Sequence, residues 1–264
     1  MLKILKIIWY NRSDLITLFN LLSFNEDLNK PNGKFDSIKK FKVLIVKTRY
    51  RHFREPLNGL THFVGIILAI IGTIILILQS TSPIKPLHIT TFSIFSAGLV
   101  LLYTASTCYH WLDLSEEWLI QLQRVDHMLI FVLIAASYTP VCLIALKGAW
   151  GWSIFGVIWG ITVFGIVTKV FWLNAPRWFS TLLYLAAGWV VIIAIWPLTQ
   201  NMTITALSWL VMGGLFYTIG AVIYAFRKPN PISDFFGYHE IFHLFILAGS
   251  ISHWVMMSRH IAIM

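Results

Sequence analysis

The chain has 264 residues, of which 58% are hydrophobic and 12% are charged. Because soluble domains carry roughly 25% charged residues, this composition excludes a fold whose whole surface faces water. The formal net charge is +9, but 12 of the 20 lysines and arginines precede Leu60. Such a cluster beside a membrane indicates a cytoplasmic segment that faces anionic lipid, so no nucleic-acid partner is expected.

Residues 1–54 form the first predicted region, a basic N-terminal segment. Lysines alternate with apolar residues over 2–9 and again over 38–47. This pattern is typical of an interfacial, partly amphipathic segment on the cytoplasmic face. A loosely ordered tail fits the same residues, and the sequence does not decide between the two.

Residues 55–264 form the second predicted region, a seven-helix transmembrane domain. Seven apolar windows lie at 60–78, 87–109, 125–146, 150–170, 181–198, 205–226 and 241–257. Each is close to the roughly 20 residues that cross about 30 Å of hydrocarbon. Backbone groups inside lipid must pair within their own segment, which favours helices throughout. The sequence therefore predicts an all-α membrane protein, a seven-transmembrane helix bundle in which successive helices are neighbours.

Basic residues also predict the orientation. The connections on the side of the N-terminal segment carry Arg124, Lys169, Arg177, Arg227 and Lys228. The opposite side carries Lys85, Lys147 and Arg259. We therefore expect a multi-pass protein of the cell (inner) membrane with a cytoplasmic N-terminus. The two cysteines, Cys108 and Cys142, fall inside apolar windows and predict no disulfide framework.

Ionisable side chains inside membrane helices are rare and costly, so each one is a candidate functional residue. His110 ends the second predicted helix, and Asp126 begins the third. His239 and His243 begin the seventh. In the predicted topology all four side chains lie near the cytoplasmic face, although they are far apart in the chain.

The pair His239 and His243 suggests a metal site. Side chains at positions i and i+4 share one face of a helix and lie about 5–6 Å apart. Two imidazoles at this spacing can bind one zinc ion, and His110 would complete the three-ligand pattern of catalytic zinc. Asp126 is then expected to orient a water or a ligand, and Ser106, one turn before His110, to hold a water or a substrate oxygen.

Other readings of these residues stay open. The stretch 239–243 reads His-Glu-Ile-Phe-His, which formally matches the zinc-protease pattern. We do not interpret it as a protease site, because the sequence indicates no cleft for an extended peptide, although it does not exclude an intramembrane protease. Asn58 and His62 either join the polar cluster or cap the first helix. His127 is expected in a packing or lipid-headgroup contact, and His253 is expected near the opposite face, too far away to join.

Taken together, these motifs resemble hemolysin III proteins, within the progestin and adipoQ receptor family that includes the adiponectin receptors. The resemblance covers about residues 54–258 and rests on Glu55 to His62, Ser106 to His110, Asp126, and His239 to His243. It implies a seven-helix bundle with a cytoplasmic N-terminus and a zinc ion (Zn2+) on His110, His239 and His243. It also implies that Asp126 and Ser106 hold or orient the zinc-bound water.

Two functions follow from this resemblance. The first is a zinc-dependent hydrolase of a lipid amide or ester, similar to the alkaline ceramidases, with Asp126 as base and membrane lipids as partners. The second is a membrane receptor, sensor or regulator with a structural zinc and no turnover. A transporter or pore is a weaker third, because few charges lie at mid-membrane. The sequence does not indicate the lipid or the oligomeric state.

Overall fold

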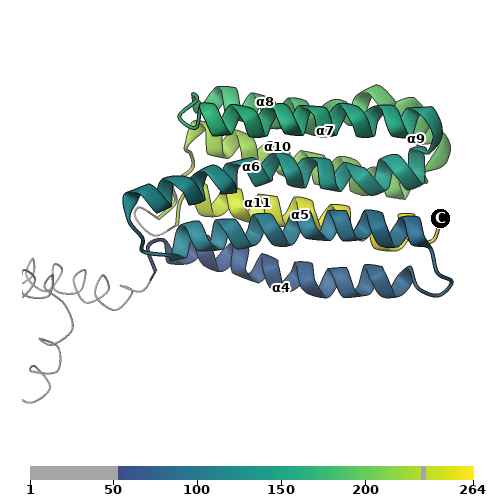
Figure 1. Ribbon diagram of the computed structural model, residues 1–264, viewed down its shortest axis with the longest axis horizontal. Helices are drawn as coiled ribbons and strands as arrows, with labels where there is room; N and C mark the ends of the chain where they lie inside the picture. Colours follow the sequence, from purple (N-terminus) through teal and green to yellow (C-terminus); the bar gives the residue numbers. More distant parts are fainter. Residues whose placement is uncertain (1–52, 233–235) are drawn as a thin grey trace, which may run out of the picture. The chain divides into compact units, whose positions relative to one another are not determined.

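Seven helical spans, each long and apolar enough to cross a membrane, make up most of the described chain. The computed structural model describes residues 53–232 and 236–264 (Figure 1). The predicted basic segment 1–54 therefore lies almost entirely outside the described residues. Its interfacial character and its role stay predictions.

The spans confirm the predicted fold class, and every predicted apolar window lies inside one of them. The first four are α4 (Pro56–Gln79), α5 (Pro86–Trp111), α6 (Glu116–Pro140) with its π-helical extension Val141–Leu146, and α7 (Gly148–Phe171). The fifth consists of α8 (Arg177–Trp189), a 3-10 segment (Val190–Ala194) and α9 (Ile195–Asn201). The last two are α10 (Ile204–Phe226) and α11 (Tyr238–Met256) with its π-helical end Met257–Ile261.

The third span begins nine residues before its predicted window, which started at 125. Its first turn carries Glu116 and Glu117, and neither belongs to an apolar run. Carboxylates are favourable at a helix N-terminus, because the backbone N–H groups there lack partners within the helix. Hydrophobicity therefore marked the core of this helix but missed its polar first turns.

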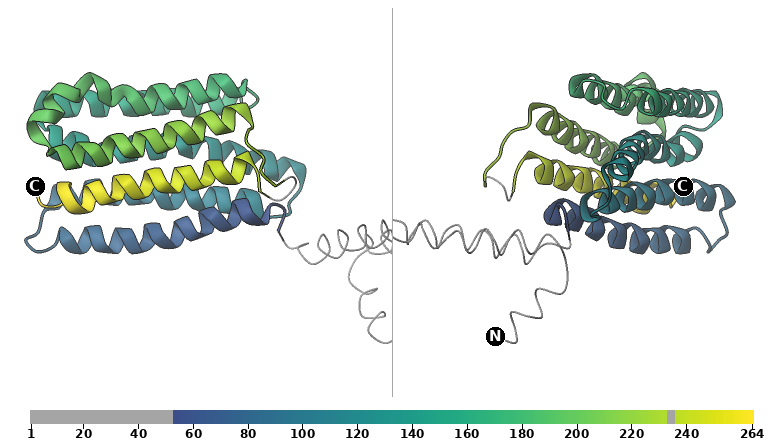
Figure 2. Two further views of the ribbon diagram at one scale, coloured as in Figure 1. Left: turned by 180° about the vertical axis from the view of Figure 1, so that it is seen from behind. Right: turned by 60° about the vertical axis from the view of Figure 1, so that its left-hand side comes forward.

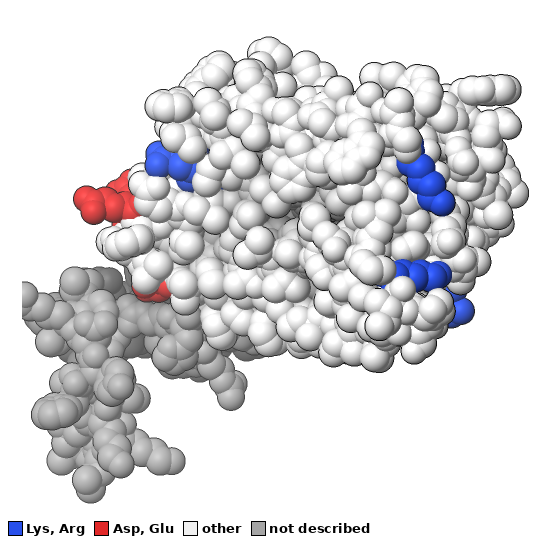
Figure 3. Space-filling view, turned by 45° about the vertical axis from the view of Figure 1, so that its right-hand side comes forward, with Lys and Arg blue, Asp and Glu red and all other residues white. Residues whose placement is uncertain are grey.

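Successive helices pack side by side, as predicted: α4 with α5, α5 with α6, α6 with α7, and α10 with α11. The last span also packs against the first, α11 against α4, while α8 contacts α10, α6 and α7. In Figures 1 and 2, α7 and α8 lie on the side of the bundle away from α4. On the face shown in Figure 3, charged side chains lie toward the two ends, and the flank between them is uncharged. Such a flank suits the hydrocarbon of a bilayer.

The third span changes helix type at Pro140. Pro140 ends the α-helical part of the third span, and a π-helical segment follows it directly. The Tyr138 hydroxyl reaches the fifth span, where it donates to the Gly188 carbonyl at 2.6 Å and accepts the Val191 N–H at 2.9 Å. It thereby pairs backbone groups beside the point where α8 gives way to the 3-10 segment.

The start of α4 is held tightly against the end of α5. The Glu55 N–H donates to the His110 carbonyl at 2.8 Å, and the Trp111 indole N–H donates to the Pro56 carbonyl at 3.1 Å. A side chain at Gly59 would collide with the Trp111 ring, so only glycine lets the two helices approach this closely. This contact places the first turns of α4 beside His110.

Candidate metal centre

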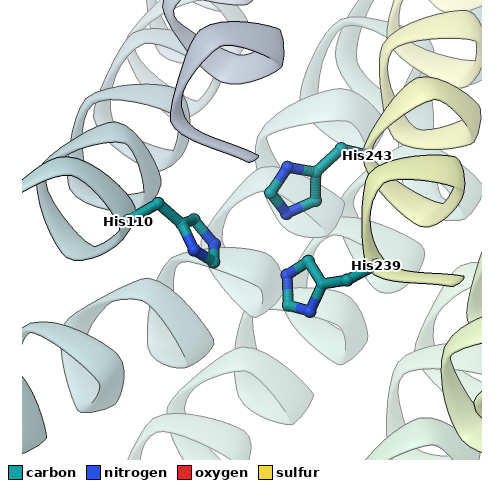
Figure 4. A group of neighbouring side chains, drawn as sticks. All are labelled: His110, His239 and His243. Atoms are coloured by element: carbon teal, nitrogen blue, oxygen red, sulfur yellow. The ribbon is translucent and has the colours of Figure 1, made fainter. Parts of the chain in front are cut away.

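Three histidines from two helices converge at one end of the bundle. His110 comes from the last turn of α5, and His239 and His243 come from the first turns of α11 (Figure 4). Each offers a ring nitrogen, and these three atoms all lie within 4.8 Å of one another. The group could therefore hold a metal ion. The topology argument placed these three side chains together correctly.

The carboxylate of Glu55 orients the first of these rings. Its Oε2 atom lies 2.7 Å from Nδ1 of His110. Burial opposes ionisation of this carboxyl, but hydrogen bonds from His110 and Asn58 and the charge of Arg54 outweigh it and hold the pKa of Glu55 below its ordinary value. An ionised carboxylate only accepts hydrogen bonds, so Nδ1 of His110 carries the proton. The Nε2 atom, which is buried without a hydrogen-bond partner in the described chain, is left for a metal.

The first turns of α4 orient the His243 ring in the same way. Its Nδ1 atom lies 3.1 Å from the Asn58 carbonyl oxygen and 3.0 Å from the Thr61 hydroxyl. A carbonyl oxygen can only accept, so Nδ1 donates and Nε2 keeps a free electron pair. Histidine ligands of metals are usually fixed by such a hydrogen bond from the other ring nitrogen.

The neighbouring His62 joins this cluster, which decides the open reading of Asn58 and His62 in favour of a polar cluster. The His62 ring stacks on His243, with 3.8 Å between ring centroids and 12° between planes. His62 is buried, and neither of its ring nitrogens has a hydrogen-bond partner among the described residues. It therefore offers an unused polar edge beside the three histidines.

A cavity of about 530 Å³ lies inside the bundle and reaches the histidine cluster. Its wall is mostly apolar, and its polar lining includes His62, Ser106, Asp126, His239 and His243. This volume lies in the range of ligand pockets, about 300–1,000 Å³. Ser106 is buried and borders the cavity, as Asp126 does. The structure thus brings both predicted catalytic side chains to the cavity, while their roles stay predictions.

Two further histidines line the cavity. Of the two contacts expected for His127, the structure shows packing inside the bundle, because its helix, α6, forms part of the cavity wall. His253 is outside the metal group, as predicted, yet it lines the same cavity, which extends along α11. Its Nε2 atom lies 3.3 Å from the Leu210 carbonyl oxygen.

The glutamate of the zinc-protease pattern has a different task here. A Glu240 carboxylate oxygen accepts the Gly237 N–H at 2.8 Å and so caps the N-terminus of α11. In the protease motif the same position acts as the general base beside the metal. The pattern at 239–243 therefore supplies two histidines and a helix cap.

Sequence reasoning did not predict the contacts of Glu55 and Thr61 with the histidines. Neither residue lies on a periodic polar face, and both contacts join positions more than 50 residues apart. Both residues lie in the stretch Glu55 to His62 that carries the family resemblance, and Glu55 stands directly before a proline that starts a helix. That position indicates a helix boundary and gives no information about the partner.

The fold and the site define a multi-pass membrane protein with three histidines that could hold a metal ion. Residues 50–254 match the family described as "Haemolysin-III related", and the chain belongs to this family. The resemblance predicted from the motifs is thereby confirmed.

Several curated relatives are similar over most of their length. "Hemolysin-3 homolog" of Bacillus subtilis (strain 168) is 35% identical over 196 residues, which cover 74% of this chain and 89% of the relative. "Hemolysin-3" of Bacillus cereus is 36% identical over 206 residues, covering 77% and 90%. "Heptahelical transmembrane protein 1" of Arabidopsis thaliana is 29% identical over 224 residues, covering 76% and 67%.

The contact between Glu55 and His110 leads to a test of metal affinity. Glu55→Gln keeps the shape of the side chain but removes the charge that fixes the His110 ring. We expect zinc affinity to fall about 10- to 100-fold, as is usual when a carboxylate behind a histidine ligand is lost. Titration with a competing chelator measures this change. Glu117→Gln, an exposed carboxylate in the first turn of α6, is the matched control, and equal affinities in both variants would contradict the assignment.

Proposed function

We propose that this protein is a zinc-dependent hydrolase that acts on a lipid amide or ester. The observation that carries the proposal is that two of the three converging histidines, His239 and His243, border one mostly apolar cavity together with Asp126 and Ser106. An acyl chain suits such a cavity. A substrate carbonyl would then lie beside the polar groups at the histidine end.

The donor set fits zinc. Imidazole nitrogen is a preferred zinc ligand, and three protein ligands are typical of catalytic sites, whereas structural sites usually have four. The buried and unpaired Nε2 of His110 is the kind of atom that a metal would satisfy. When bound, zinc supplies Lewis-acid polarisation of a carbonyl and a nucleophilic water near neutral pH.

Side chains of the protein would transfer the proton and stabilise the developing negative charge. Asp126 is the proposed base, which takes a proton from the attacking water and passes it to the leaving amine or alcohol. The Ser106 hydroxyl would donate a hydrogen bond to the oxygen on which negative charge develops. The apolar wall keeps bulk water away from these groups and thereby strengthens both interactions.

We further propose that the protein lies in the cell membrane with its N-terminus and the histidine group toward the cytoplasm. The basic segment 1–54 and three basic residues at the histidine end, Arg124, Arg227 and Lys228, support this orientation. A lipid substrate would then enter between helices from the cytoplasmic leaflet.

The test is lipid turnover by zinc-loaded, full-length protein in micelles. A panel of lipid amides and esters is incubated with the protein, and released fatty acids are measured by mass spectrometry. We expect release that is lost with a chelator and restored by added zinc. Zinc-loaded protein that binds lipids but releases no fatty acid from any of them would favour the alternative, a receptor or sensor with a structural zinc.

A further inference from the structure

A buried lysine lines the cavity from the last turn of α7. The Lys169 side chain is 2% exposed, and its ammonium group donates one hydrogen bond, to the Ser180 hydroxyl at 2.6 Å. An ammonium group has three donors, and no carboxylate lies within ion-pair distance of it among the described residues. A charge held in this way inside a membrane protein is costly and usually marks a ligand pathway.

A second cation, Arg177, borders the same cavity from the first turn of α8. Its guanidinium lies 5.1 Å from the centre of the Tyr224 ring, and Nη1 donates to the Tyr238 hydroxyl at 3.3 Å. Both partners are neutral tyrosines, so the charge of Arg177 is not balanced by an acid in the part of the chain that the structure describes.

The two cations lie near each other and near the metal group. Arg177 and Ser180 are three residues apart in α8 and so share one face of this helix, and Ser180 holds the Lys169 ammonium. The Tyr224 ring contacts both Arg177 and His239, with 5.1 Å from its centroid to the guanidinium and 5.7 Å to the centroid of His239. One aromatic ring is therefore shared by Arg177 and the metal group.

We propose that Lys169 and Arg177 form a binding site for an anionic group, a carboxylate or a phosphate, on the lipid that occupies the cavity. The inference rests on the proposed function, because it places the acyl chain in the same cavity. It adds a preference that the three histidines do not explain: among lipids with equal chains, those with a negatively charged head group bind best. A lipid is favoured over a free anion, because the cations border a mostly apolar cavity.

The experiment compares two lipid amides of equal chain length on immobilised, zinc-loaded, full-length protein. N-palmitoyl glycine carries a carboxylate, and N-palmitoyl ethanolamine carries a neutral hydroxyl. We expect the first to bind about 10-fold tighter or more, since hydrogen bonds to charged partners are the strong ones. Lys169→Met and Arg177→Gln are each expected to bring the ratio of dissociation constants toward one, and Lys169→Arg to keep it.

Lys228→Met is the matched control, because it removes an exposed lysine from the connection between α10 and α11. Zinc content and affinity for the neutral amide show that each variant is folded. Equal affinity of the wild type for the two amides overturns the inference, and so does a full preference kept by both Lys169→Met and Arg177→Gln. Inorganic phosphate that binds tightly and displaces the glycine conjugate overturns the choice of a lipid ligand.

Binding is read from the first seconds of each injection, before released palmitate is detectable, and turnover is measured in a separate experiment, so the two proposals fail separately. A protein that prefers the glycine conjugate but hydrolyses no lipid contradicts the hydrolase alone. A protein that hydrolyses lipids but binds both amides equally contradicts the anion site alone.

Discussion

His243→Ala is expected to remove zinc from the purified protein, from about one ion per chain to almost none. His243 supplies one of the three converging nitrogens and is the histidine whose ring is fixed by α4. Loss of a direct ligand should cost more than the roughly 10- to 100-fold in affinity that follows loss of a supporting hydrogen bond. Elemental analysis of protein dialysed against a weak chelator measures the change.

His260→Ala is the matched control, because His260 lies in the π-helical end of the same span, outside the metal group. We expect it to keep its zinc. If His243→Ala elutes as a folded monodisperse protein and still holds one equivalent of zinc, the three histidines are not the metal site.

Asp126→Asn is expected to keep zinc and to lose lipid hydrolysis by about 10²- to 10⁴-fold, the usual contribution of a general base. The substitution preserves side-chain shape but leaves an amide that cannot take a proton. Asp126 lies outside the three-histidine group, so metal content should not change. The measurements are initial rates of fatty-acid release and zinc content of the same preparation.

Asp113→Asn controls for the loss of one carboxylate, because Asp113 is exposed in the connection between α5 and α6. Its turnover should equal that of the wild type. Full activity in Asp126→Asn would assign the proton transfer to another group, and joint loss of zinc and activity would make Asp126 a support of the metal site.

The fold could be predicted because lipid imposes a simple requirement on sequence. A membrane helix must be apolar over about 20 residues, and each of the seven windows met this condition. The ends of the helices were harder to predict from the sequence. The first turns of α6 contain Glu116, Glu117 and Arg124, and these residues belong to the helix for reasons of capping and packing that hydropathy does not measure.

The candidate site was partly predictable. Helical spacing paired His239 with His243, and alternation of the spans brought His110 and Asp126 to the same end. The surroundings of each charged side chain could not be predicted in this way. Lys169 and Arg177 counted only as markers of orientation, yet both border the cavity, because whether a terminal lysine points to water or inward depends on how neighbouring helices pack.

The hydroxyl of Tyr138 ties the third span to the break in the fifth, at a place where neither lipid tails nor apolar side chains could replace it. Loss of this hydroxyl would leave the Gly188 carbonyl and the Val191 N–H at the break without this hydrogen-bond partner. A regular, unbroken fifth span would in turn leave the hydroxyl without these two partners. Position 138 and the break, 50 residues further on, therefore depend on each other for the pairing of their polar groups. We expect descendants of this fold to change them together, in paired steps.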